Sequence, residues 1–108
     1  VPAQELAALL ADLEEQGVLP AEDRDRLFRT DLVVRARRGA QEVWLAVEIS
    51  AVVDAHDVER AARAAAILAA LFGTEAVAVA AGQETTPAAR EAATAQGVLL
   101  LTDGAPVV

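Results

Sequence analysis

The chain has 108 residues, a formal net charge of −8 and an apolar fraction of 55% that comes mainly from Ala, Val and Leu. This length is sufficient for one hydrophobic core and too short for two of ordinary size, so we expect one main domain. Cysteine is absent, which excludes disulfides, zinc–thiolate sites and thiol nucleophiles.

Lysine and methionine are absent as well, so all nine basic residues are arginine and chemistry that needs a side-chain amine is excluded. A chain without an initiator Met is expected to be a fragment or a processed product. No apolar run approaches a membrane span, and residues 1–17 lack the pattern of a signal peptide. We therefore expect a soluble, cytoplasmic protein with no membrane partner. The acidic excess disfavours nucleic acid as a partner without removing it from the candidates.

The first predicted element is an amphipathic helix from Pro2 to Gln16. Its leucines at 6, 9, 10 and 13 have the i, i+3, i+4, i+7 spacing of one apolar stripe, and Gly17 supplies a C-terminal stop. We assign residues 1–19 to this helix and 20–108 to an α/β domain. The stripe is also compatible with the end of a coiled coil, which would pair two chains into a homodimer.

A short charged helix is expected over 21–28, opened by Pro20. Two strands rich in β-branched and apolar residues follow, over 31–38 and 42–50. The residues between them, Gly39 and Ala40, suit a two-residue hairpin loop, because a type II′ turn requires Gly at its first central position. We therefore predict an antiparallel hairpin.

The rest of the chain alternates helices and strands. Asp54 is a good N-cap for a long helix that Gly73 ends, and the apolar run 76–81 indicates a strand covered on both faces. A second helix, opened by Thr86 and Pro87, and a last strand over 98–102 complete the pattern. The fold class predicted is α/β, a hairpin followed by β-α-β-α-β with right-handed parallel crossovers.

The predicted turn fixes the hairpin register, because every cross-strand pair then has residue numbers that sum to 79. Asp31 falls opposite Glu48, so two carboxylates face each other in a largely apolar strand. Like charges in this position are unfavourable, and burial of Glu48 increases the cost. A divalent cation would offset the repulsion, and so would an Arg counter-charge that has no catalytic role.

Asp31 at the start of one hairpin strand and Glu48-Ile49-Ser50 at the end of the next resemble the signature of the PD-(D/E)XK, or restriction-endonuclease-like, nucleases. The resemblance covers roughly residues 31–81 in element order. It implies a metal-dependent phosphodiesterase fold, with Mg²⁺ or Mn²⁺ held by Asp31, Glu48 and the carbonyl of Ile49. It also implies a lysine at the position of Ser50, and no lysine exists anywhere in the chain.

Arg29 falls opposite Ser50 by the same pairing rule, so we expect its guanidinium to occupy the position of the missing cation. Arginine transfers protons poorly but holds phosphate well, which favours a weakly active or inactive relative of these nucleases. His56, the single histidine, is interpreted as an exposed residue beside a helix N-cap, with a ligand or base role as the alternative. Arg60 belongs to a solvated helix face or reaches toward the two carboxylates.

Three functions stay open at this point. The first is a nuclease-like domain that uses Asp31, Glu48, Ser50 and Arg29, with a divalent metal. The second is a noncatalytic interaction domain that dimerises, through the N-terminal helix or as the end of a coiled-coil protein. The third is a small-molecule site at the carboxyl ends of the parallel strands, which only analogy between folds supports.

Overall fold

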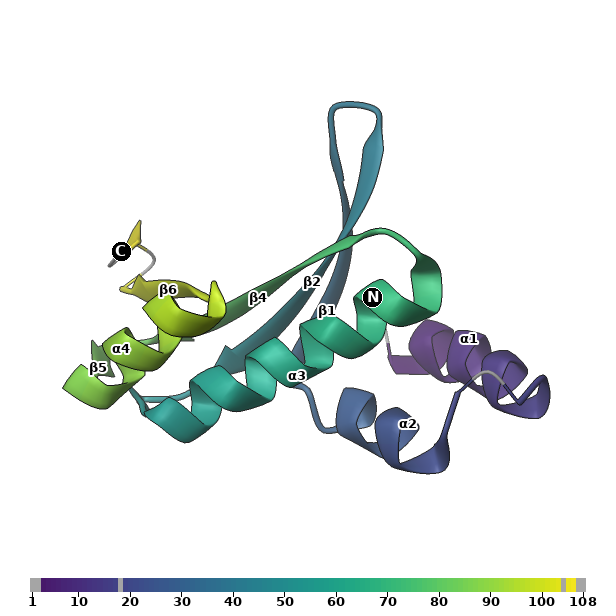
Figure 1. Ribbon diagram of the computed structural model, residues 1–108, viewed down its shortest axis with the longest axis horizontal. Helices are drawn as coiled ribbons and strands as arrows, with labels where there is room; N and C mark the ends of the chain where they lie inside the picture. Colours follow the sequence, from purple (N-terminus) through teal and green to yellow (C-terminus); the bar gives the residue numbers. More distant parts are fainter. Residues whose placement is uncertain (1–2, 18, 104, 107–108) are drawn as a thin grey trace.

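The computed structural model describes residues 3–17, 19–103 and 105–106, which form an α/β fold with a mixed sheet (Figure 1). The helices are α1 (Ala3–Glu15), α2 (Ala21–Phe28), α3 (Ala55–Phe72) and α4 (Pro87–Gln96). The main sheet has the order β1-β2-β4-β6-β7, formed by β1 (Leu32–Arg38), β2 (Gln41–Ile49), β4 (Glu75–Gly82), β6 (Leu99–Thr102) and β7 (Ala105–Pro106). A second, small sheet pairs β3 (Val52–Val53) with β5 (Glu84–Thr85). The fold class predicted from the sequence is confirmed.

The β1-β2 hairpin has the predicted register. Pairs run from Leu32 opposite Val47 to Arg38 opposite Gln41, so that all residue numbers sum to 79. Gly39 has a φ of 63°, the positive value that the first central position of a type II′ turn requires. The turn lies at the end of a hairpin that projects beyond the helices (Figure 1).

The helix ends also agree with the sequence signals. Asp54 and Asp57 form a capping box at the start of α3, in which each carboxylate accepts from the backbone N–H of the other residue. Thr86 caps α4 through its side chain, which accepts from the N–H of Ala89. Gly73 ends α3 in the left-handed conformation. The start predicted for the first helix, Pro2, lies outside the described residues.

The helices and one face of the sheet enclose the core. The buried side chains on this face include Val33, Trp44, Ala46, Ala80 and Leu100, and helix α3 packs on β2 and β4 above them. Trp44 stacks on Phe72 with ring centroids 4.5 Å apart. The apolar stripe of α1 contributes to the same core, because Leu6 and Leu10 are 5% and 0% exposed.

The opposite face of the sheet is apolar and none of the described helices packs on it, although the sequence predicted β4 to be covered on both faces. Two side chains of this face, Val43 and Val79, are nevertheless buried, at 4% and 6% exposed. The strands progress in one direction, β2 to β4 to β6, so right-handed crossovers place α3 and α4 on the same side. We call the opposite side the open face. Alternation along the strands assigns to it Leu32, Val34, Ala36, Val43, Leu45, Val47, Ile49, Val77, Val79, Ala81, Leu99 and Leu101.

Gly82 fixes the end of β4 against the connection that follows β2. A Cβ at this position would lie 2.1 Å from the carbonyl oxygen of Ser50 and 2.9 Å from a methyl of Val53. The close backbone approach therefore excludes any side chain here. In the described part of the chain, no helix has both the length and the apolar character to cross a bilayer.

Candidate functional site

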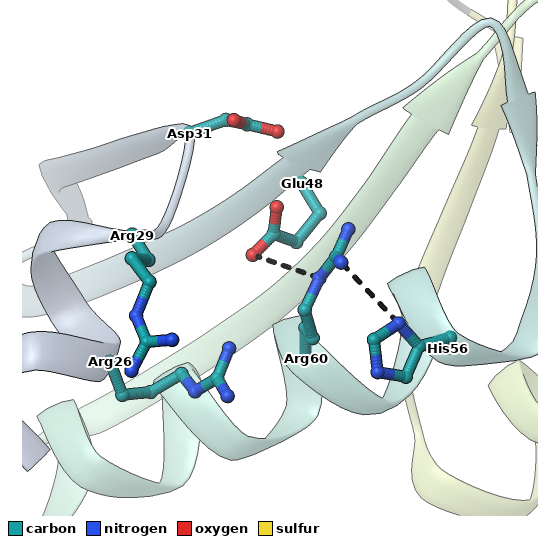
Figure 2. Close-up of a pocket in the computed structure, with 6 residues that line it drawn as sticks. All are labelled: Arg26, Arg29, Asp31, Glu48, His56 and Arg60. Carbon is teal, nitrogen blue, oxygen red and sulfur yellow. Dashed lines mark hydrogen bonds and ion pairs between the residues drawn. The ribbon is translucent and has the colours of Figure 1, made fainter. Parts of the chain in front are cut away.

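A pocket of about 420 Å³ opens where α2, β2 and the first turns of α3 meet (Figure 2). Its lining is almost entirely charged and consists of Arg26, Arg29, Asp31, Glu48, His56 and Arg60. Helix α2 supplies Arg26 and ends at Arg29, β2 supplies Glu48, and α3 supplies His56 and Arg60. The fold thus brings together residues that are more than 30 positions apart in the sequence.

The hairpin places Asp31 beside Glu48, as the register predicted. Asp31 directly precedes β1, and its Oδ2 accepts a 2.8 Å hydrogen bond from the backbone N–H of Ile49. Glu48 points into the pocket from β2, and its side chain is only 3% exposed (Figure 2). The Asp31 carboxylate therefore links the start of β1 to the end of β2 through a hydrogen bond, whereas the Glu48 carboxylate lines the pocket.

Burial raises the pKa of Glu48 from 4.5 to about 7, and the nearby Asp31 carboxylate adds to the shift through a hydrogen bond and through repulsion. Arg60 acts in the opposite direction and lowers this pKa. Glu48 is consequently close to half protonated at neutral pH. The protonated form can donate a hydrogen bond to Asp31, which reduces the repulsion that the sequence indicated.

Arg60 supplies only part of the counter-charge. Its Nε lies 3.9 Å from Glu48 Oε1, which is an ion pair but too long for a hydrogen bond. Its terminal nitrogen binds Asp57 Oδ1 instead, within the same helix. Glu48 Oε1 is buried without a hydrogen-bond partner among the described residues. A buried acceptor in this state costs about 1 to 3 kcal/mol, so a ligand that donates to it would gain that energy.

Two further arginines in the pocket have uncompensated charge. Within the described residues, no carboxylate lies within 4.0 Å of Arg26 or Arg29. Arg29 Nε donates to the backbone oxygen of Asp25 at 3.3 Å, which leaves its other nitrogens directed toward the pocket (Figure 2). A smaller hollow of about 120 Å³ adjoins this pocket and adds Arg63 and Glu59 to the lining. Four of the nine arginines therefore gather in one region of an acidic chain.

Other predicted site residues are placed differently. Ser50 is absent from the pocket lining; its Oγ donates to the carbonyl of Val52 and its N–H donates to the carbonyl of Ala81. The prediction for Ile49 concerns its main-chain carbonyl and stays a prediction; the Ile49 side chain is 59% exposed and belongs to the open face. Arg29 lies in the pocket but not opposite Ser50, because α2 ends at Arg29 and the β1 ladder begins only at Leu32. That pairing prediction was wrong, since the ladder was extended across a helix cap.

The donor set suits an anion better than a metal ion. In the described part of the chain, no group of three or more His, Cys, Asp or Glu side chains is arranged to hold a metal. Glu48 is near its pKa, and three guanidinium groups line the same pocket, so a divalent cation would meet competing positive charge. The sequence reasoning missed Arg26, whose signal was its position three residues before Arg29, on the same face of a helix.

His56 is exposed, as predicted, and its Nδ1 lies 3.4 Å from the Arg60 guanidinium (Figure 2). Arg60 does reach toward the carboxylates, which was one of its two predicted placements. These two side chains form the α3 wall of the pocket. Comparison with protein-family models, curated proteins and solved structures gave no match to this chain.

Proposed function

We propose that this is a noncatalytic, nuclease-like domain whose charged pocket binds a phosphate group. The observation that carries the proposal is the convergence of Arg26, Arg29 and Arg60 on one pocket, with two of the three free of carboxylate partners among the described residues. Arginine binds phosphate through charge-assisted, often bidentate, hydrogen bonds. Local positive charge in a concave site attracts an anion even when the whole chain is acidic.

Glu48 supports binding of a phosphate through its protonated form. A neutral Glu48 does not repel the anion as an ionised carboxylate would, and its single O–H donates either to Asp31 or to the phosphate. Because the pKa of Glu48 is about 7, protonation of Glu48 when phosphate binds costs little free energy near neutral pH. Phosphate affinity should accordingly fall as the pH rises above 7.

The resemblance to PD-(D/E)XK nucleases bears on what happens to the bound group. Asp31 and Glu48 are the two carboxylates on which the resemblance rests, and both line the pocket. The chain has no lysine, and the Ser50 hydroxyl is engaged with Val52, so the group that positions an attacking water is missing. These features favour recognition of a phosphodiester or phosphomonoester over its hydrolysis.

Calorimetric titration with inorganic phosphate at about pH 6.5 tests the proposal. Replacement of Arg26 or Arg29 by Ala should weaken phosphate binding about 10-fold, the equivalent of one lost charge-assisted hydrogen bond. Arg90→Ala is the matched control, because Arg90 is exposed on α4, outside the pocket. Equal weakening by Arg90→Ala, or no phosphate binding by the unmodified chain, would contradict the proposal.

A parallel titration with Mg²⁺ or Mn²⁺ examines the metal-dependent nuclease alternative. Two carboxylates, Asp31 and Glu48, are the ligands that the resemblance implies. Metal binding that is lost in Glu48→Ala but kept in the exposed control Glu91→Ala would favour that alternative. Cleavage of a short DNA or RNA duplex in the same metal buffer would then establish hydrolysis.

Dimerisation through α1 is the other function that the sequence suggested, and it has less support. Leu6 and Leu10 are already buried in the domain core, so only Leu9 and Leu13, each partly buried, are left for a coiled-coil partner. Two leucines make a short seam. An interaction role is better served by the open face of the sheet.

A further inference from the structure

We infer that a second copy of this chain docks on the open face and forms a homodimer. This face consists of the twelve apolar side chains defined above, all on the side of the sheet away from α3. Three of them are unusually exposed for large apolar residues: Leu32 is 44% exposed, Ile49 59% and Leu99 38%. They lie on β1, β2 and β6, whereas Val43 of β2 and Val79 of β4 are 4% and 6% exposed, so the exposed area is greatest toward the ends of the strands.

The open face is large enough for a weak dimer. Strands are about 4.8 Å apart and alternate residues about 6.7 Å, so each position covers about 32 Å², and the ten positions other than the buried Val43 and Val79 cover about 320 Å². This is the projected area of one copy, and the accessible area is larger because side chains roughen the surface. Two copies would therefore bury about 1,000 Å², near the minimum for a specific interface. We expect a dissociation constant in the micromolar range.

The chemistry of the face selects a partner surface that is equally apolar. None of the twelve side chains carries a charge or a hydrogen-bonding group, although the chain has a net charge of −8. Arg38 and Glu75, which lie on this side at the hairpin end of the sheet, form an ion pair of 3.1 Å. A nucleic acid or a charged peptide would meet no group of opposite charge on these side chains. The same apolar side chains of a second copy would meet no like charge that repels them.

The geometry favours the same partner. Two sheets with the same twist pack face to face at about −30°, and a second copy has the same twist by identity. A two-fold dimer uses the same patch on both subunits, which a self-complementary apolar surface satisfies. The charged pocket lies on the helix-covered side and would stay open in such a dimer. Failure of the dimer and failure of phosphate binding are therefore separate results.

Sedimentation velocity of the full chain from about 1 to about 200 µM tests the inference. The wild-type chain should shift from monomer to dimer within this range. Leu32→Lys with Leu99→Lys adds two charges to the open face of each copy and should raise the dissociation constant at least about 100-fold. The control pair Ala66→Lys and Ala95→Lys adds the same charges to exposed positions on α3 and α4 and should dimerise like the wild type.

A chain that stays monomeric at about 200 µM, or a Leu32/Leu99 variant that dimerises like the control pair, would overturn the inference. A second readout identifies the surface without adding charge. The chain contains no cysteine, so Leu45→Cys introduces a single thiol at the centre of the open face. Its reaction with a thiol reagent should slow at least about 10-fold at dimerising concentrations, whereas Ala66→Cys should react equally fast at all concentrations. Equal rates for both thiols would argue that the face is not covered.

Discussion

Replacement of Glu48 by Gln should make the protein more stable at neutral pH and leave its stability almost unchanged in acid. The side chain is 3% exposed, and its pKa rises from 4.5 in the unfolded chain to about 7 in the folded one. Below about pH 4.5 both states are protonated, so Glu48 carries no ionisation cost. As the pH rises, the unfolded state ionises first and becomes favoured, until the folded state also ionises near pH 7.

The size of the effect follows from the difference between the two pKa values. Each unit corresponds to about 1.4 kcal/mol, so the folded wild-type protein loses about 3 kcal/mol of stability between pH 4.5 and 7 from this residue. Gln has the shape of a protonated Glu and can donate to the Asp31 carboxylate, but it does not ionise. The stability of Glu48→Gln relative to wild type should therefore rise by about 3 kcal/mol over this interval and stay constant above it.

Urea denaturation at a series of pH values from about 4 to about 8.5 would measure this difference. Trp44 is the single tryptophan and is buried against Phe72, so its fluorescence reports unfolding directly. Glu91→Gln removes an exposed carboxylate from α4 and should change stability by less than about 0.5 kcal/mol throughout. A Glu48→Gln difference that is flat with pH, or that favours the wild type as the pH rises, would refute the reasoning.

Four further substitutions test the fold, each measured by urea denaturation. Gly82→Ala should cost at least about 2 kcal/mol, because the new methyl would overlap the backbone oxygen of Ser50. Gly39→Ala should cost about 1 kcal/mol, because the new methyl meets no neighbour and only the positive φ of the backbone is unfavourable for Ala. Asp54→Ala removes the cap of α3 and should cost about 1 kcal/mol at neutral pH. The Asp54 carboxylate accepts a hydrogen bond from the backbone N–H of Asp57, which lowers its pKa in the folded state, so its stabilisation is present above the unfolded pKa and lost as the pH falls through the folded pKa. The loss caused by Asp54→Ala should therefore be smaller at acid pH. Leu10→Ala should cost about 2 to 5 kcal/mol if α1 packs on the core, and a loss below about 1 kcal/mol would show that α1 is detached.

The fold was predictable from the sequence where a single residue type has a specific backbone role. Gly39 defined the hairpin turn and its register, Asp54 and Gly73 defined the ends of the long helix, and all three were confirmed. The coverage of β4 was not predictable in the same way. A continuous apolar run fits a strand buried on both faces and equally a strand with one apolar face left open. Only the lateral order of the strands decides between them.

The candidate site was predictable in its acidic half and not in its basic half. Asp31 directly precedes β1 and Glu48 lies on the paired strand β2, so the turn geometry alone placed them together. Arg26 and Arg29 come from a helix that packs against the sheet, and the angle of that packing has no local signal in the sequence. The raised pKa of Glu48 depends on the burial that α3 provides, which is likewise a property of tertiary structure.

The lateral order of the main sheet, β1-β2-β4-β6-β7, has a consequence for synthesis on the ribosome. Each strand that follows β2 in this sheet joins at the outer edge, beside the strand placed before it. No strand has to be inserted between two that are already paired. A nascent chain can thus extend the sheet from one side as successive strands emerge, without separating any pair already made.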